Sequence, residues 1–263
     1  MHCQPAGTPE VDDAGRAAGR VALRVRAQEW FDRLHGCLLP PRCVLCLDPG
    51  RPPTLDLCGA CEADLPRHGP ACPRCGDARG GESAPCARCA LAPPPYARVL
   101  APYRYAWPVD ALVRGFKYHG QLPHGRVLGT LLAEAVLADA APLPQLLVPV
   151  PLHPSRERER GYNQAWELAR VAGRLLGIPV APTLCARTRA TPPQATLDAA
   201  ARRANLAAAF AVRAPPGAAH VAVVDDVLTT GATLAAVSSA LLAAGVTRVD
   251  GWAVARAVAL PAR

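Results

Sequence analysis

The sequence predicts an α/β fold in which a doubly wound parallel sheet with flanking helices follows a small cysteine-rich segment. Two observations support this fold class. From residue 98 onward, short apolar runs alternate with stretches of helical periodicity, and such alternation is typical of parallel sheets with crossover helices. Between residues 41 and 92, cysteines recur in pairs and aliphatic residues are few, so this part is too poor in apolar residues to fold around a core of its own.

The expected elements follow one another in the order of a doubly wound sheet. Strands or extended segments are expected at residues 98–105, 146–150, 178–184, 221–224 and 249–256. Helices are expected at 109–118, 125–139, 163–176 and 234–244, with a short helix or loop at 199–210. Ligands of such sheets bind beyond the carboxyl ends of the strands. The turns at 149–151 and 225–233 follow two of these ends, so we expect them to be neighbours.

The charge of the chain points to an anionic partner. The 263 residues carry a formal net charge of +8. Between residues 150 and 210, nine arginines stand against four acidic residues, which leaves a local excess of +5. A positive region of this kind suits a pyrophosphate or a nucleic acid.

The N-terminal residues predict neither a membrane span nor a secretory signal. Residues 1–20 are expected to form a disordered leader, and residues 21–40 a short amphipathic helix with Trp30, Phe31 and Leu34. Acidic residues and the lack of an apolar core argue against a signal peptide, and no segment is apolar for long enough to span a bilayer. We therefore expect a soluble, cytoplasmic protein.

Eight of the eleven cysteines form four CxxC pairs between residues 41 and 92. The pairs are Cys43/Cys46, Cys58/Cys61, Cys72/Cys75 and Cys86/Cys89. A CxxC places two thiolates on one tight turn, and four thiolates close a tetrahedral structural Zn²⁺ site. The sequence therefore predicts two zinc ribbons in tandem, each stabilised by its metal.

Other uses of these cysteines fit the pattern less well. A reducing compartment disfavours disulfides, and four copies exceed what one redox CxxC requires. The pairing of the four units stays open, because sequential pairing and interleaved pairing (first with third) both satisfy the spacing. The remaining cysteines, Cys3, Cys37 and Cys185, are not expected to be ligands.

The segment 221–233 predicts a site for a phosphorylated sugar. An apolar strand delivers Asp225 and Asp226, whose carboxylates can accept hydrogen bonds from vicinal ribose hydroxyls. A turn rich in hydroxyls then leads into a helix whose N-terminus favours a phosphate, and Gly231 allows unusual backbone dihedrals. The alternative, in which Thr or Asp only caps the helix, requires fewer polar residues. The candidate binding residues are Asp225, Asp226, Val227, Leu228, Thr229, Thr230, Gly231, Ala232 and Thr233.

A second candidate segment, 149–164, carries alternating charges. Arg156, Arg158 and Arg160 alternate with glutamates, and in an extended loop this spacing would present all three guanidinium groups on one side. Arginine suits phosphate because its planar fork donates two hydrogen bonds. The alternative is an ordinary charged loop before a helix that Asn163 caps. A third segment, 187–205, has the composition of a mobile lid over a charged ligand, and equally of a solvated linker.

Together these motifs resemble the ComF/GntX family of phosphoribosyltransferase-like proteins. The matching parts are the CxxC pairs at 43–89, FKYHG at 116–120, PVPLHP with RERGYNQ at 149–164, the segment at 187–210, and VVDDVLTTGAT at 223–233. The resemblance extends from about Leu38 to the end of the chain. One departure is Ser155, which stands where the family often has lysine after the HP pair.

The resemblance implies a type I phosphoribosyltransferase-like domain over residues 96–263 that binds phosphoribosyl pyrophosphate. Asp225 and Asp226 would be catalytic and bind the ribose 2′- and 3′-hydroxyls, and residues 229–233 would hold the 5′-phosphate. Mg²⁺ would bridge pyrophosphate and ribose oxygens, and the reaction would be a glycosyl transfer through an oxocarbenium-like centre. The implied pyrophosphate loop comprises Pro149, Val150, Pro151 and Leu152 with Arg156, Arg158 and Arg160.

The resemblance also implies a role in DNA uptake and natural transformation, with single-stranded DNA or the competence machinery as partners. Catalysis is expected, but the acceptor is not specified: the candidate hood at 96–124 offers Tyr103, Tyr105, Trp107, Lys117 and His119 without a pattern that names a base. His119 and His153 are expected to be solvated loop histidines. The alternative is a non-catalytic competence factor that uses the fold to bind nucleic acid or nucleotides.

Overall fold

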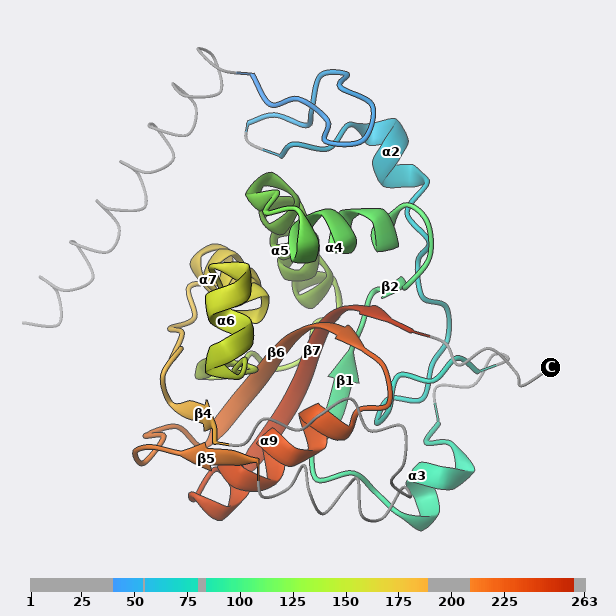
Figure 1. Cartoon of the computed structure of the whole chain (residues 1–263). Helices are drawn as coiled ribbons and strands as arrows, with labels where there is room; N and C mark the ends of the chain where they lie inside the picture. Colours follow the sequence, from blue (N-terminus) through green and yellow to red (C-terminus); the bar gives the residue numbers. More distant parts are fainter. Residues whose placement is uncertain (1–39, 54, 80–83, 189–208, 258–263) are drawn as a thin grey trace, which may run out of the picture. The chain divides into compact units, whose positions relative to one another are not determined.

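The computed structural model describes residues 40–53, 55–79, 84–188 and 209–257 (Figure 1). The chain divides into two compact units, 1–58 and 59–263, and each is described by itself. The expected leader, nearly all of the expected helix at 21–40 and most of the segment at 187–210 lie outside the described residues. Among the described residues, no helix combines the length and apolar character needed to cross a membrane.

Within the described part of 59–263, five strands form one parallel sheet in the order β1-β7-β6-β3, with β2 also paired to β7. The strands are β1 (Arg98–Leu100), β2 (Tyr103–Arg104), β3 (Leu146–Pro149), β6 (His220–Leu228) and β7 (Arg248–Arg256). The central strands β6 and β7 are apolar over most of their length and buried on both faces, as strands covered by helices on both sides are. Figure 1 shows them running side by side.

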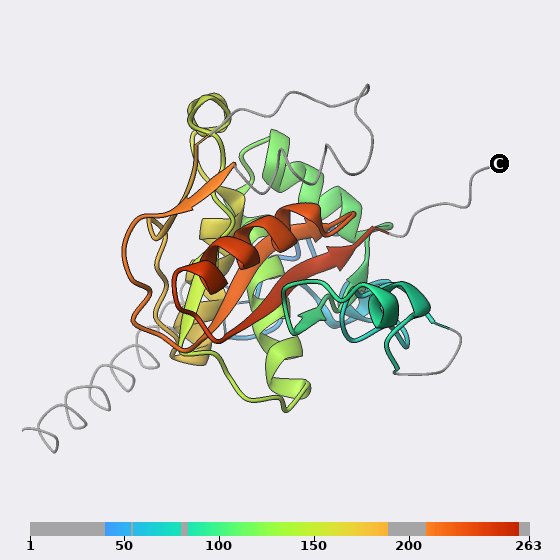
Figure 2. The ribbon, with the colours of Figure 1, turned by 90° about the horizontal axis from the view of Figure 1, so that it is seen from below.

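Helices cover both faces of this sheet. On one face α7 (Gln164–Leu176) packs on β3 and β6, and α5 (Leu122–Ala138) packs on α7 and on α4 (Val109–Tyr118). On the other face lies α9 (Ala232–Ala243), which packs on β6 and β7 (Figure 2). The short helix α6 (Pro154–Arg160) precedes α7, and β4 (Cys185–Arg187) pairs with β5 (Phe210–Val212) in an antiparallel ribbon.

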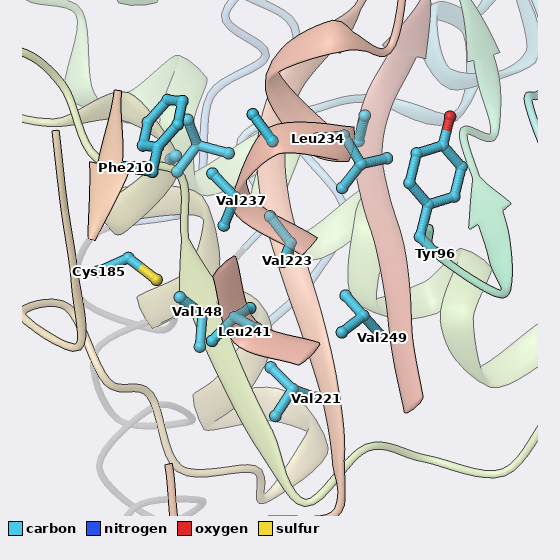
Figure 3. Packing of buried hydrophobic residues seen from close by; sticks show 14 of the residues in the cluster. Tyr96, Val148, Cys185, Phe210, Val221, Val223, Leu234, Val237, Leu241 and Val249 are labelled. Atoms are coloured by element: carbon cyan, nitrogen blue, oxygen red, sulfur yellow. The ribbon is translucent and has the colours of Figure 1, made fainter. Parts of the chain in front are cut away.

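The core between the sheet and α9 fixes the helix that follows the Asp pair. Val221 and Val223 of β6 lie in the same buried cluster as Leu234 and Val237 of α9 (Figure 3), and all four are at most 3% exposed. Burying an aliphatic side chain of this size contributes about 1.5–3 kcal/mol. The start of α9 is therefore held against the strand that carries Asp225 and Asp226.

The local signals at the ends of the helices explain where they begin and stop. Asn163 caps α7 as expected, with its side chain accepting a hydrogen bond from the backbone N–H of Trp166 at 3.3 Å, and α7 ends at Gly177, whose φ is 69°. A glycine in the left-handed region is the usual end of a helix. The helix α5 begins three residues before the expected position, because Pro123 is well placed in a first turn.

Several expected boundaries are wrong. The strand expected at 98–105 is two short strands, because the main chain leaves β7 at Pro102, whose carbonyl accepts a hydrogen bond from the N–H of His68 at 2.7 Å. The segment 178–184, expected to be extended, pairs with the sheet through a bridge between Val180 and Leu147. The strand expected at 221–224 continues to Leu228, so the two aspartates lie within β6.

Candidate functional site

Asp225 and Asp226 are held near the carboxyl end of β6 by hydrogen bonds from neighbouring backbone groups. The N–H of Asp226 donates to Oδ1 of Asp225 at 2.9 Å, and the N–H of Val227 donates to Oδ1 of Asp226 at 2.6 Å. Each carboxylate thus has one oxygen fixed by the chain itself. The arrangement orients both side chains before any ligand is present.

Burial shifts the proton affinity of this pair. Burial is the largest cause that raises the pKa of Asp225 to about 7, and the charge of Asp226 raises it further. The N–H of Asp226 and the ammonium group of Lys117 act in the opposite direction. Asp225 therefore binds its proton more tightly than an ordinary aspartate does, while Asp226 faces a cation.

Lys117, in the last turn of α4, is that cation. Its Nζ lies 2.8 Å from Oδ1 of Asp226, and the two side chains are only 19% and 10% exposed. An ion pair in such a site is costly to break, because the remaining charge would be left buried. Sequence reasoning placed Lys117 in the candidate hood and did not include it with the aspartates. Its only signal was the FKYHG motif, which says nothing about a partner on a distant strand.

The end of α4 is fixed by residues of the RGYN motif. The hydroxyl of Tyr162 donates a hydrogen bond to the carbonyl of Phe116, and the rings of these two residues lie 5.4 Å apart. The guanidinium group of Arg160 lies 5.4 Å from the ring centre of Tyr118, a cation–π distance. Two motifs that are separate in the sequence therefore hold Lys117 in place together.

The turn after β3 lies directly beside the Asp pair, as expected. Pro149 is paired with Val224 across the two strands, and the N–H of Val150 donates to the carbonyl of Val224 at 2.9 Å. The side-chain amide of Asn163 donates to the carbonyl of Val150 at 3.1 Å. The prediction that the turns at 149–151 and 225–233 are neighbours is confirmed.

The expectation of an extended loop with three arginines on one side is wrong. Residues 154–160 form the helix α6, which begins after His153 and ends at Gly161, whose φ is 79°. Successive residues of a helix are rotated by about 100°, so residues two apart point in nearly opposite directions. The sequence allowed this outcome, because Pro154 and the glycine are signals for the start and end of a helix.

The three arginines consequently have different surroundings. Arg160 points inward and donates to Oε1 of the buried Gln164 at 2.9 Å. Arg158 donates to the carbonyl of Pro154 at 3.3 Å, on the exposed side of α6. Arg156 is exposed, and it approaches Arg187: burial first, and then the charge of Arg156, lowers the pKa of Arg187.

His153 and Ser155 have a structural role at the start of α6. Nδ1 of His153 accepts a hydrogen bond from the N–H of Ser155 at 3.3 Å, and it lies 2.7 Å from the Ser155 hydroxyl. His153 is therefore the N-cap of a helix. Ser155, which departs from the family pattern, thus helps to form the start of α6.

The turn of residues 229–233 leads into the first residues of α9. Thr229 and Thr230 are exposed, whereas Gly231 is buried with a φ of 77°. A Cβ at Gly231 would lie 2.9 Å from Oη of Tyr96, so both the dihedral and the space require glycine. Thr230 accepts a hydrogen bond from the N–H of Ala232 at 3.3 Å. The positive end of the α9 dipole is directed at this turn.

The aromatic residues of the candidate hood are dispersed. Tyr103 is buried at 2% exposure, with the guanidinium group of Arg67 5.7 Å from its ring centre. Trp107 is 71% exposed, and His119 is also exposed. Tyr103 is therefore part of the core, whereas Trp107 and His119 are exposed to solvent.

The eight paired cysteines form two tetrads. The first tetrad is Cys43, Cys46, Cys58 and Cys61, and the second is Cys72, Cys75, Cys86 and Cys89; within each, the sulfur atoms lie within 4.8 Å of one another. The pairing is thus sequential, and the interleaved alternative is not what the structure has. Cys185 lies in the apolar core, where burial raises its pKa to about 11. Cys3 and Cys37 lie outside the described residues.

Both tetrads fit a zinc ion. Sγ of Cys46 lies 3.6 Å from Sγ of Cys58, and Sγ of Cys75 lies 3.7 Å from Sγ of Cys86. A tetrahedron with Zn–S bonds of about 2.3 Å places its sulfurs roughly 3.8 Å apart. Burial acts to raise the pKa of Cys43 and of Cys72, but backbone N–H groups lower each to about 6. Each tetrad thus contains a thiol that is a thiolate at neutral pH.

The parallel sheet with helices on both faces and the two tetrads define the class of this protein. It is an α/β protein in which a double zinc ribbon precedes the sheet in the sequence, and the fold class expected from the sequence is confirmed. The family model of the double zinc ribbon domain matches residues 34–90.

Two relatives identify the family. The DNA utilization protein YhgH of Salmonella typhi is 34% identical over 222 residues, which are 83% of this chain and 98% of the relative. Competence protein F of Haemophilus influenzae is 34% identical over 224 residues, which are 82% of this chain and 97% of the relative. The chain belongs to the ComF/GntX family, as its motifs predicted. Among solved structures, a purine phosphoribosyltransferase from Pyrococcus horikoshii Ot3 aligns with 53% of this chain and 92% of its own, at 15% identity and a TM-score of 0.29.

Proposed function

We propose that this protein binds phosphoribosyl pyrophosphate, or a related sugar phosphate, and transfers its phosphoribosyl group to an acceptor. One observation carries the proposal. Two oriented carboxylates, Asp225 and Asp226, lie between the start of α9 and the turn after β3. A ribose 5-phosphate needs acceptors for its hydroxyls and donors for its phosphate, and these two kinds of group adjoin one another at this edge of the sheet.

Each part of the site has a role in this proposal. The carboxylates of Asp225 and Asp226 accept hydrogen bonds from the 2′- and 3′-hydroxyls. The backbone N–H groups of residues 229–233, with the exposed hydroxyls of Thr229 and Thr230, hold the 5′-phosphate. Fixed negative charge near C1 stabilises the positive charge that develops there as the bond to the leaving group breaks.

The pyrophosphate group would lie at the turn of residues 149–152, which adjoins the Asp pair through Val224. Of the three arginines expected there, Arg156 has the exposed position suited to an anion, whereas Arg160 is already bonded to Gln164. We therefore propose Arg156 as the main cationic contact of pyrophosphate, with smaller contributions from Arg158 and Arg160.

Mg²⁺ fits this site as a companion of the ligand. Among the described residues, the groups that could enclose a metal ion are the two cysteine tetrads, so Mg²⁺ would be held mainly by pyrophosphate and ribose oxygens. When bound, it would neutralise charge on the leaving pyrophosphate. The protein orients the sugar, and Lys117 forms an ion pair with Asp226 beside it.

The names of the relatives support a role in the use of DNA. One relative is a DNA utilization protein and another a competence protein, and we propose that this chain likewise serves DNA uptake or utilization. Single-stranded DNA or the competence machinery are the proposed partners.

A second candidate function is binding without catalysis. The separate positions of the hood aromatics favour it, because Tyr103 is buried and Trp107 is exposed. In this case the fold would be a nucleotide- or nucleic-acid-binding module, and single-stranded DNA would bind through arginines in a salt-dependent manner. Replacing Arg156, Arg158 and Arg160 by alanine would then weaken DNA binding, whereas Asp225→Asn with Asp226→Asn would not.

Titration calorimetry with phosphoribosyl pyrophosphate and Mg²⁺ tests the main proposal. The wild-type protein is expected to bind with saturable heat, and the double variant Asp225→Asn/Asp226→Asn to lose it. Asp64→Asn, at an exposed position of the first part of the 59–263 unit, is the matched control. A wild-type protein that gives no heat at millimolar ligand would refute the proposal. Release of pyrophosphate with an acceptor then separates transfer from binding alone.

A further inference from the structure

The second tetrad is joined to the α/β domain by Asp77, which directly follows its first CxxC turn. The N–H of Cys72 donates to the carbonyl of Asp77 at 2.9 Å and thereby closes this turn. The carboxylate of Asp77 binds two guanidinium groups. Oδ2 lies 2.6 Å from Nη2 of Arg88, in the second half of the same ribbon, and Oδ1 accepts a hydrogen bond from Nη2 of Arg256.

Arg256 carries this connection to the candidate phosphate site. It is the last residue of β7 and is only 5% exposed. Its Nη1 donates to the carbonyl of Leu228 at 2.8 Å, and Leu228 is the residue at which β6 gives way to the 229–233 turn. One buried guanidinium group thus binds both a carboxylate of the ribbon and the backbone at the start of the turn.

Further contacts hold the ribbon against the same edge of the sheet. The N–H of Val99 in β1 donates to the carbonyl of Pro73 at 2.9 Å, inside the first CxxC turn of the second tetrad. Nε2 of His68 lies 2.6 Å from the carbonyl oxygen of Gly76. The ribbon is therefore fixed at more than one point. If Arg256 moved, these contacts would keep Asp77 from moving with it.

A cavity lies where the ribbon and the turn meet. Its volume is about 590 Å³, and Cys75, Cys89 and Arg88 line it together with Thr230 and Gly231. Tyr96 also lines it, with its hydroxyl against Gly231. The second tetrad and the 229–233 turn are thus walls of one cavity, although the Asp pair is not part of its lining.

We propose that Asp77 and Arg256 are positioning residues of the phosphate site, through which zinc in the second tetrad fixes the 229–233 turn. Bound zinc holds the Cys72–Asp77 turn in one conformation, because structural zinc sites fold only with their metal. Asp77 then neutralises Arg256, and Arg256 holds the carbonyl of Leu228. Without the metal, Arg256 becomes an uncompensated buried cation, and the carbonyl of Leu228 keeps the N–H of Ala257 as its donor, at 2.9 Å, but loses the guanidinium group.

The chain supplies a matched control in the first ribbon. Asp48 stands at the same place after its CxxC turn, and its carbonyl accepts a hydrogen bond from the N–H of Cys43 at 2.8 Å. Unlike Asp77, Asp48 is an exposed residue. Asp48→Asn therefore makes the same chemical change in the corresponding turn of the first ribbon.

Hydrogen exchange of the ligand-free protein tests the proposal without relying on the proposed substrate. Zinc content is first measured, and two zinc ions per chain are expected in every variant that alters only an aspartate. In Asp77→Asn, the amides from residue 228 to residue 235 are expected to exchange at least tenfold faster than in the wild type, and in Asp48→Asn at the wild-type rate. Unchanged exchange in Asp77→Asn would overturn the proposal.

A second variant covers the case in which Asp77→Asn does not fold. Arg256→Lys keeps the positive charge but lacks the fork that binds Asp77 and Leu228 together, so the same faster exchange is expected. A further pair of variants removes one ligand from each tetrad: Cys86→Ser from the second and Cys46→Ser from the first. Only Cys86→Ser should make the amides of the 229–233 turn exchange faster. Equal loosening by both would contradict the assignment to the second tetrad.

The ligand arm of the test rests on the proposed function. Asp77→Asn is expected to raise the Kd of phosphoribosyl pyrophosphate with Mg²⁺ at least tenfold, and Asp48→Asn to leave it unchanged. If the wild-type protein does not bind this ligand, the proposed function fails, but the exchange measurement still decides whether Asp77 and Arg256 fix the turn. If the ligand binds and Asp77→Asn has the wild-type Kd, the positioning role fails alone.

Discussion

The two CxxC turns at Cys43–Asp48 and Cys72–Asp77 have the same backbone but different surroundings. In the first turn, the N–H of Leu47 donates a hydrogen bond to the carbonyl of Cys43 at 2.9 Å. In the second turn, the N–H of Gly76 donates to the carbonyl of Cys72 at 2.8 Å. Leu47 and Gly76 both have a φ of 69°. The aspartate after the first turn is exposed, whereas Asp77 binds Arg88 and Arg256. The same metal-binding turn thus serves its own ribbon in one place and is built into the α/β domain in the other.

The largest expected difference concerns the metal ligands themselves. Cys43→Ser and Cys72→Ser each remove a buried ligand whose pKa is lowered to about 6, and each should reduce zinc from two ions to one. Structural zinc contributes on the order of 10 kcal/mol to such a site. We expect only Cys72→Ser to lose binding of phosphoribosyl pyrophosphate, measured by calorimetry. If both variants lost binding, the claim that only the second ribbon supports the phosphate site would be wrong.

A smaller effect is expected when the buried guanidinium is removed. Arg256→Met leaves Asp77 paired with Arg88 alone and should lower the free energy of unfolding by about 3 kcal/mol. This value is at the low end for a broken buried ion pair, because the Asp77 side chain is 39% exposed. Urea unfolding measures this difference. Arg42→Met is the control, because Arg42 belongs to the first ribbon and binds the carbonyl of Leu47 from an exposed position. If the two variants lost the same free energy of unfolding, the buried contacts of Arg256 would not stabilise the protein more than the exposed contact of Arg42 does.

The two regions are also expected to respond to pH in opposite directions. The pKa of Asp225 is raised, first by burial, from 3.8 to about 7. The folded state therefore binds this proton more tightly than the unfolded state, and its stabilising contribution is lost as the pH rises from about 4 through 7. In the protein without bound zinc, the pKa of the Cys72 thiol is lowered from 9.0 to about 6, so its stabilising contribution is complete above about pH 9 and is lost as the pH falls through 6.

Asp225→Asn isolates the carboxyl part of this prediction. The variant should be more stable than the wild type at pH 8, by about 2 kcal/mol on the scale of 1.4 kcal/mol per pKa unit after allowing for relaxation, and the difference should vanish near pH 4. Urea unfolding of both proteins across this range, with zinc present, gives the comparison. A difference that does not change with pH would mean that Asp225 has an ordinary pKa.

The smallest expected effect tests the shared backbone. Gly76→Ala places a Cβ in the left-handed region and 3.4 Å from Cγ1 of Val99, which should cost about 1 kcal/mol. Leu47→Ala keeps a Cβ in the same backbone conformation at a residue that is 74% exposed, and should be nearly neutral. Thermal unfolding of the two variants measures the difference, and equal changes would indicate that Gly76 is not needed for its dihedral.

Much of the fold could be predicted from the sequence, because its local signals agree with its packing. The periodicity of residues 109–118 and the cap at Asn163 gave α4 and the start of α7 correctly. The strand carrying Asp225 was placed correctly but was too short, because two carboxylates in a strand interior oppose the usual preference of strands. Pairing with β7 on to Leu228 is a tertiary effect that the sequence does not display.

The candidate site was predictable in its parts and not in its connections. The Asp pair and the turn after β3 were found because each follows an apolar strand. The contacts of Lys117 with Asp226 and of Asp77 with Arg256 join residues far apart in the chain, and no local pattern reports such pairs. The arginines of α6 were predicted to lie in an extended loop because of the alternating charges. The proline and the glycine that mark the two ends of a short helix were the better signals.

The most direct test of the account is an NMR titration of the isotope-labelled protein with phosphoribosyl pyrophosphate and Mg²⁺. The account predicts saturable shifts of the backbone amides of residues 225–233, together with those of residues 150–152. It also predicts that Asp77→Asn weakens these shifts at a given ligand concentration, whereas Asp48→Asn does not. Binding that shifts amides elsewhere and leaves residues 225–233 unchanged would contradict it.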